Sequence, residues 1–199
     1  MKVFIVGKHA SGKHEALQVC EEQGVVVGRE FSNIEAPDPR IYMDPRYNQY
    51  SVDDISNIFE MKSYICMHGV EESGVIDSYM IQRGISFYTY DQSDVMVLTP
   101  QQLENINKPI LKDKILFVWM DSTQTARIRR HAEENRKYSF SEQEEIENRY
   151  SVDFVKTLYN FPNSQVLYFN NEDPARVGTI ISSIIKHPDL LDNFVNNYR

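Results

Sequence analysis

The first two dozen residues place a strand-like run, a glycine-bounded turn and a helix-like pattern in immediate succession. Lys2 to Val6 is apolar after its lysine and partly β-branched, which is typical of a central parallel strand buried on both faces. Gly7 and Gly12 bound the turn, and apolar residues then recur at helical spacing as far as Gly24. Strand, tight loop and helix in this order predict an α/β fold with a parallel central sheet.

The turn itself has the composition of a phosphate-binding loop. The pattern G-x-x-x-x-G-K-[ST] fits at Gly7, Gly12 and Lys13. Glycines let successive N–H groups face an anion, the helix adds its positive end, and the lysine reaches the β- and γ-phosphates of a nucleotide. The residues predicted to bind the triphosphate are Gly7, Lys8, His9, Ala10, Ser11, Gly12, Lys13 and His14. The alternative is a chance match in an unrelated turn.

His14 stands where the pattern has a hydroxyl, and this bears on the metal ion. Mg²⁺ prefers hard oxygen ligands, for which an imidazole nitrogen is a poor substitute. We therefore expect Mg²⁺ to be held through phosphates and water, or by another carboxylate, and we assign no metal ligand in the chain.

Composition narrows the classes of partner. The chain has 199 residues, enough for one α/β domain, and a formal net charge of −8, which repels nucleic-acid backbones. Two cysteines and a short apolar run after Lys2 are typical of a cytoplasmic protein without signal peptide or membrane span. We expect a small-molecule nucleotide substrate, no general nucleic-acid or membrane binding, and a monomer or homodimer.

The segment from Arg29 to Tyr50 contains three prolines and is predicted to be irregular. Its arginines either surround a small anionic substrate or lie on the surface. The remaining predictions for the first half of the chain are a helix over 51–59, a strand over 63–67, a turn over 71–74 and a helix over 75–82.

Further strands are expected at 94–98 and 114–120, both of the buried type, and at 165–169, with helices after each. Thr99 and Pro100 predict a helix start, as does Pro174, and Ser141 with Glu144 predicts a capping box. A local cationic set occupies the region after the strand at 114–120. Its members are Arg127, Arg129, Arg130, Arg136, Lys137 and Arg149. They predict either a flap that closes over phosphates or ordinary surface ion pairs with nearby glutamates.

Taken together, these motifs resemble the guanylate-kinase-like branch of the P-loop nucleoside monophosphate kinases. The loop G-K-H-A-S-G-K, the irregular insert, and the Arg-x-x-Arg and Ser-x-x-Glu-Glu-Ile-x-x-Arg segments carry the resemblance, which covers nearly the whole chain. It implies a P-loop NTPase three-layer αβα fold with an inserted monophosphate-binding subdomain and a helical lid. The implied boundaries are a core of 1–28, 94–130 and 153–186, an insert of 29–93, a lid of 131–152 and a tail helix of 187–199.

The same resemblance implies roles for individual residues. Lys13, Arg130, Arg136 and Arg149 would act on the transferring phosphoryl group, and Asn171 would line the adenine pocket. Loops of the S-G-K-D kind occur in related phage nucleotide kinases, so a hydroxyl after the lysine is not required. The acceptor side is assigned to Arg29, Ser32, Arg40, Glu72, Asp77 and Tyr79.

Two functions follow from the sequence. The first is an ATP-dependent nucleoside or deoxynucleoside monophosphate kinase that uses ATP and Mg²⁺. The second is a catalytically degenerate guanylate-kinase-like domain that binds a nucleotide or a protein. His14, the missing Thr-Thr-Arg-x-x-Arg segment and the missing base-reading turn favour the second, whereas Lys13 and the lid arginines favour the first.

Overall fold

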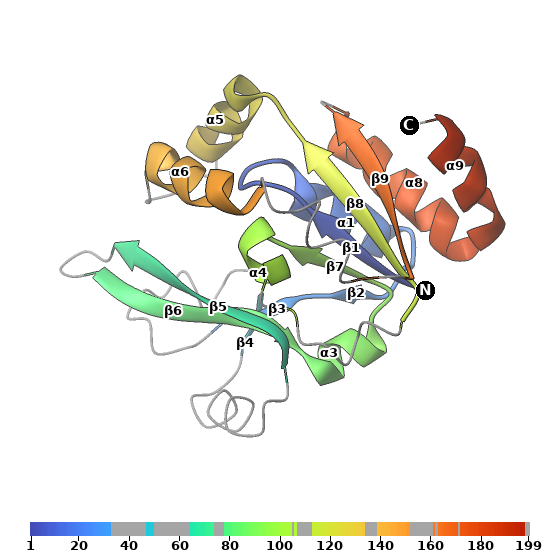
Figure 1. Ribbon diagram of the computed structural model, residues 1–199, viewed down its shortest axis with the longest axis horizontal. Coiled ribbons are helices and arrows are strands. Elements are labelled where there is room, and N and C mark those ends of the chain that lie inside the picture. Colours follow the sequence, from blue (N-terminus) through green and yellow to red (C-terminus); the bar gives the residue numbers. More distant parts are fainter. Residues whose placement is uncertain are drawn as a thin grey trace.

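A computed structural model describes residues 1–32, 47–49, 64–73, 78–104, 106, 113–133, 139–151, 161, 163–170 and 172–197. Its centre is a five-stranded parallel sheet flanked by helices (Figure 1). The strands are β1 (Lys2–Val6), β2 (Val27–Gly28), β7 (Val95–Leu98), β8 (Ile115–Asp121) and β9 (Ser164–Asn170), in the order β2-β7-β1-β8-β9. The predicted α/β class with a parallel sheet is confirmed.

Successive residues of a strand point to opposite faces of the sheet, and in β1, β7 and β8 the residues on both faces are buried. On one face Val3, Ile5 and their counterparts on β7 and β8 pack against α1 (Lys13–Glu22), α8 (Pro174–Lys186) and α9 (Leu191–Asn197). On the other face Phe4, Val6 and their counterparts form a second apolar cluster. The continuous apolar runs seen in the sequence are therefore explained by burial on both sides.

A second, four-stranded sheet lies beside the parallel one (Figure 1). It consists of β3 (Glu30–Ser32), β4 (Tyr47–Gln49), β5 (Tyr64–Ser73) and β6 (Ser78–Ser86), in the order β4-β3-β6-β5. Strands β5 and β6 pair antiparallel along most of their length. Cys66 of β5 and Ile85 of β6 belong to the second apolar cluster, so this end of the sheet shares a core with the parallel sheet.

Several local predictions for this region were wrong. Residues 71–73 continue β5 where a turn was expected, and residues 78–82 belong to β6 where a helix was expected. The segment predicted to be irregular contains β3 and β4, and α3 (Phe87–Gln92) was not predicted. The expected helix over 51–59 lies outside the described residues.

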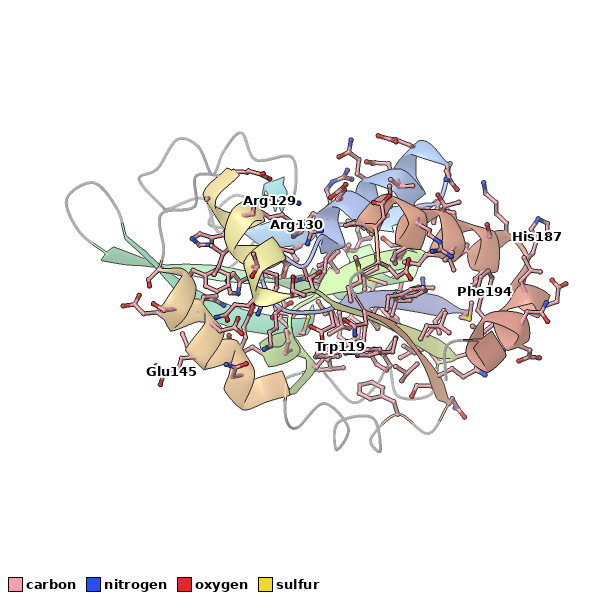
Figure 2. The ribbon with its side chains drawn as sticks, turned by 90° about the horizontal axis from the view of Figure 1, so that it is seen from above. Trp119, Arg129, Arg130, Glu145, His187 and Phe194 are labelled. Atoms are coloured by element: carbon pink, nitrogen blue, oxygen red, sulfur yellow. The ribbon has the colours of Figure 1, made fainter. Side chains whose placement is uncertain are left out.

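The remaining helices are close to their predicted positions. Helix α4 (Pro100–Glu104) follows Thr99, and α8 begins at Pro174 with its N-cap Asp173 accepting a hydrogen bond from Ala175 N. Helices α5 (Gln124–Glu133) and α6 (Phe140–Ser151) lie side by side (Figures 1 and 2). The capping box at Ser141 was wrong: α6 starts at Phe140, two residues before the start that Ser141 as N-cap implies, and Ser139 Oγ accepts from Glu142 N.

After α8 the chain forms a short 3₁₀ turn (Pro188–Leu190) and then α9. Both cysteines are buried free thiols, and burial raises the pKa of each. None of the described helices has the length and apolar character needed to cross a membrane.

Candidate functional site

The loop from Gly7 to Gly12 joins the carboxyl end of β1 to the first turn of α1. Strand β1 is the central strand of the parallel sheet, with β7 on one side and β8 on the other. The chain crosses from β1 toward one edge of the sheet and later returns to fill the other. In open α/β sheets ligands bind at such a point, outside the carboxyl ends of the strands. The predicted loop thus lies at this position.

The two loop glycines are required by the backbone itself. At Gly7 a Cβ atom would overlap the carbonyl oxygen of Met120, so the loop passes directly against β8. Gly12 has φ +93° and serves as the N-cap of α1, and a Cβ there would overlap Pro174. Ala10 also adopts a positive φ, +54°, which costs free energy in a residue other than glycine. The loop is held in a specific, partly strained curl.

Lys13 lies across this curl. Its side chain is buried, and Nζ donates to the carbonyl oxygens of Gly7 and Lys8, each at 2.6 Å. Ser11 Oγ lies 3.5 Å from the same nitrogen. An ammonium group held at the loop in this way has the position from which it can meet a phosphate.

A second cation reaches the loop from α5. Arg130 Nη1 donates to Ala10 O and to Ser122 Oγ, both at 3.3 Å. Ser122 follows β8, and its hydroxyl donates to Ser11 O at 3.3 Å. Arg129, the preceding residue of α5, is exposed and pairs with Glu133 at 3.6 Å. Of these two neighbours, labelled in Figure 2, Arg130 contacts the loop and Arg129 forms an ordinary surface ion pair.

Arg127 links α5 to α6 instead of contacting the loop. Its guanidinium donates to both carboxylate oxygens of Glu144, at 2.5 and 2.8 Å, and its Nε donates to Ser122 O. It also lies over the ring of Phe140 at 5.4 Å. The side chain of Arg127 is buried. Of the predicted cationic set, the three members on α5 therefore differ: Arg130 contacts the loop, Arg127 links two helices and Arg129 lies on the surface.

Helix α6 brings carboxylates to the loop, and this contact was not predicted from the sequence. Glu147 Oε2 accepts from His9 N at 2.8 Å and lies 2.7 Å from His9 Nδ1, with which it shares a hydrogen bond. Glu144 accepts from Lys8 Nζ at 3.1 Å, and Asn148 Oδ1 accepts from the same amine at 2.5 Å. These residues are spaced i, i+3 and i+4, so they share one face of α6. The sequence shows this spacing, but it does not show that the loop residues Lys8 and His9 are the partners of this face.

Both carboxyl groups have a lowered pKa. Hydrogen bonds from Arg127 bring the pKa of Glu144 to about 2, with Lys8 adding to the effect and partial burial opposing it. Burial works to raise the pKa of Glu147, but the hydrogen bond from His9 and the charge of Lys13 outweigh it and lower the pKa. Each group is therefore a carboxylate at neutral pH.

His9, Glu144 and Glu147 also form the kind of cluster that holds metal ions, with one possible ligand atom from each within 4.8 Å of the others. The surrounding charge opposes a cation. Lys8, Lys13, Arg127 and Arg130 carry four positive charges against two on the glutamates. This network therefore does not fit direct binding of Mg²⁺, and it favours an anion.

Of the residues predicted for the acceptor side, the structure describes Arg29, Ser32, Glu72 and Tyr79. Arg29 Nη2 donates to Glu21 Oε2 of α1 at 2.6 Å. Glu72 and Tyr79 face each other in the β5–β6 register, and Ser32 is the last residue of β3. His14 lies in the first turn of α1 and Arg149 in α6. Arg40, Asp77, Arg136 and Asn171 are outside the described residues.

A further polar pair lies at the carboxyl ends of β8 and β9. Tyr168 OH donates to Asp121 Oδ2 at 2.8 Å, and burial together with this carboxylate raises the pKa of Tyr168 to about 12. The other oxygen of Asp121 accepts from Ser122 N. Asp121 thus fixes the segment that carries Ser122 to the loop.

No protein-family model matches the chain, and no curated protein sequence is found to match it. Functional inference therefore depends on the site itself.

Proposed function

We propose that this chain is an ATP-dependent nucleoside or deoxynucleoside monophosphate kinase of guanylate-kinase-like type. The observation that carries the proposal is the contact that Lys13 of α1 and Arg130 of α5 make with a glycine-bounded loop at the carboxyl end of the central strand. Phosphoryl transfer depends mainly on positioning and on neutralising charge, so it needs no dedicated nucleophile on the protein. The positive charge around the loop would neutralise the phosphates, and the fixed conformation of the loop would position them.

In this proposal the loop backbone and Lys13 bind the β- and γ-phosphates of ATP. Arg130 follows the γ-phosphoryl group as negative charge redistributes in the transition state. Arg136 and Arg149 are further candidates for this role, and Arg29, Ser32, Arg40, Glu72, Asp77 and Tyr79 remain candidates for the acceptor. Mg²⁺ would enter with the phosphates of ATP and its own water ligands, since the described cluster of His9 and two glutamates does not fit it.

The test is an assay of ADP formation with ATP, Mg²⁺ and a panel of nucleoside and deoxynucleoside monophosphates. We expect one acceptor to give ADP, and Lys13→Ala and Arg130→Ala each to lower kcat/KM by about 100-fold. Arg129→Ala is the matched control: the residue is a neighbour on α5 whose side chain pairs with Glu133. Its activity should equal that of the wild type. If no acceptor gives Lys13-dependent ADP, the proposed kinase is rejected.

A non-catalytic nucleotide-binding domain is the second candidate, and the position of Arg29 favours it. A guanidinium paired with Glu21 of α1 must leave this carboxylate before it can bind an acceptor phosphate. Thermal unfolding with ATP separates the two functions. ATP at one hundred times its Kd should stabilise a binding protein by about 2.7 kcal/mol. Lys13-dependent stabilisation without ADP formation from any acceptor would support the binding domain.

A further inference from the structure

Glu147 places a carboxylate at the loop that the proposed function assigns to phosphate. The residue is 1% exposed, although it belongs to a helix whose neighbouring Glu145 lies on the outer side (Figure 2). Its Oε2 accepts from the backbone N–H of His9, a loop residue, at 2.8 Å. A buried glutamate requires strong partners, and here those partners are groups of the loop.

The contact has the chemistry of phosphate binding. Loop amides and a nearby lysine bind anionic oxygens because they offer N–H donors and positive charge in a concave backbone. Glu147 presents such an oxygen to a loop amide, and the charge of Lys13 acts on it. A phosphate oxygen and this carboxylate oxygen therefore compete for the same donor.

A second loop cation is held by the same helix face. Lys8 Nζ donates to Glu144 Oε1 at 3.1 Å and to Asn148 Oδ1 at 2.5 Å. While α6 is in this position, the amine of Lys8 and the N–H of His9 both have partners on α6. An incoming triphosphate that uses these groups must replace those partners.

The balance of charge shows why such an exchange is feasible. With Glu144 and Glu147 in place, Lys8, Lys13, Arg127 and Arg130 bring four positive charges to these two carboxylates. A triphosphate carries more negative charge than the two carboxylates whose contacts with His9 and Lys8 it would replace, so it can displace them. A bound anion of lower charge would be a weaker competitor.

We propose that Glu147 is a built-in competitor for the phosphate loop, so that a triphosphate binds as α6 releases His9 and Lys8. This inference rests on the proposed function only in that the loop binds a triphosphate, and it does not require phosphoryl transfer. The apparent Kd equals the intrinsic Kd divided by the fraction of molecules with a released loop. A tenfold preference for the docked form thus weakens the apparent affinity by about tenfold.

The first experiment measures the Kd of inorganic tripolyphosphate by titration calorimetry, without Mg²⁺ or acceptor. Glu147→Gln keeps the shape of the side chain but removes its charge, and we expect it to bind about 5- to 10-fold more tightly than the wild type. Glu145→Gln, on the exposed side of α6, removes the same charge and should leave the Kd within about twofold. Unchanged or weaker binding by Glu147→Gln overturns the inference.

The second experiment uses the wild-type chain and so does not depend on the folding of a variant. Amide hydrogen exchange reports local opening of a helix. Tripolyphosphate should slow exchange at loop residues 8–13 and speed exchange in α6. Slower exchange in α6 would mean that the helix closes on the ligand, and this would overturn the inference.

The two proposals fail separately. Tighter binding by Glu147→Gln without ADP formation from any acceptor rejects the kinase and leaves the competitor in place. ADP formation together with weaker tripolyphosphate binding by Glu147→Gln supports the kinase and rejects the competitor.

Discussion

At the scale of single residues, the loop depends on backbone positions that accept no side chain. Gly12 combines φ +93° with direct contact of its Cα region against Pro174. Its conformation and its neighbour both exclude a Cβ atom. The requirement comes from the loop and from the start of α8 together.

We therefore predict that Gly12→Ala destabilises the chain and removes triphosphate binding. The positive φ alone costs about 1–2 kcal/mol in a residue other than glycine, and the overlap with Pro174 adds about 1–3 kcal/mol. Urea unfolding measures the sum. Gly24→Ala is the matched control, since Gly24 has φ +79° and open space around its Cα. Gly24→Ala should lower the free energy of unfolding only by the cost of the positive φ. Equal losses of stability in the two variants would contradict the role given to Pro174.

The role of a loop residue could be predicted from the sequence only where the residues it acts with are close to it along the chain. Gly7, Gly12 and Lys13 were predicted as parts of one loop because their spacing along the chain is itself the signal. The contact of His9 with Glu147 joins residues 138 positions apart, and no local pattern can supply that pairing. The sequence identified the basic residues near the loop but not the carboxylates that face it.

At the scale of elements, the link between α5 and α6 is the ion pair of Arg127 and Glu144. Both side chains are mostly removed from solvent, at 4% and 15% exposed, and the contact is bidentate. We predict a coupling free energy of about 1–3 kcal/mol from a double-mutant cycle with Arg127→Met and Glu144→Gln. The measurement is the free energy of unfolding in urea.

The pair of Arg129 and Glu133 gives the matched cycle on the same helix. Its side chains are 71% and 64% exposed and its atoms are 3.6 Å apart. An exposed pair at this spacing contributes about 0.3–0.5 kcal/mol. Equal coupling in the two cycles would mean that burial does not strengthen the α5–α6 link.

The same link predicts a dependence of stability on pH. The pKa of Glu144 is about 2 in the folded chain against an ordinary value of 4.5. Because folding lowers this pKa, its contribution is complete above about pH 4.5 and is lost as the pH falls toward about 2. The difference in unfolding free energy between wild type and Glu144→Gln should narrow over that interval. A constant difference from pH 7 to pH 3 would be the contrary result, and Glu145→Gln corrects for the change of net charge.

Elements were predictable where burial determines the pattern. Strands β1, β7 and β8 are buried on both faces, so their residues are continuously apolar and were found. Part of strand β6 was predicted to be helical, as the second half of a helix over 75–82. Its structure depends on antiparallel pairing with β5, a contact between segments that the local pattern does not contain.

At the scale of the whole molecule, the parallel sheet positions the loop and a small polar contact ties the second sheet to it. Strand β3 begins at Glu30, just after β2 ends at Gly28. Glu30 is buried and accepts from Nε2 of Gln102, a fully buried residue of α4. The oxygen of the same amide accepts from Thr99 N at 2.8 Å. One amide therefore connects the end of β7, helix α4 and the second sheet.

We predict that Gln102→Leu destabilises the chain by about 3 kcal/mol, because it removes the donor to the Glu30 carboxyl and the acceptor for Thr99 N. In a chain of this size that corresponds to a fall in Tm of about 6–12 °C. Gln101→Leu makes the same chemical change at the adjacent, partly exposed position of α4, and it should cost less than Gln102→Leu because its side chain is not fully removed from water.

Two probes show whether the sheets unfold together. Trp119 is the single tryptophan of the chain and lies in β8, so its fluorescence follows the parallel sheet, whereas far-UV circular dichroism follows both sheets. Since Cys66 and Ile85 of the second sheet share a core cluster with Phe4 and Phe117 of the parallel sheet, the two urea transitions should coincide in the wild type. If Gln102→Leu separates them, with the dichroism change preceding that of Trp119, the amide is the connection between the sheets. Coincident and unshifted transitions in Gln102→Leu would instead assign the connection to the shared apolar core alone.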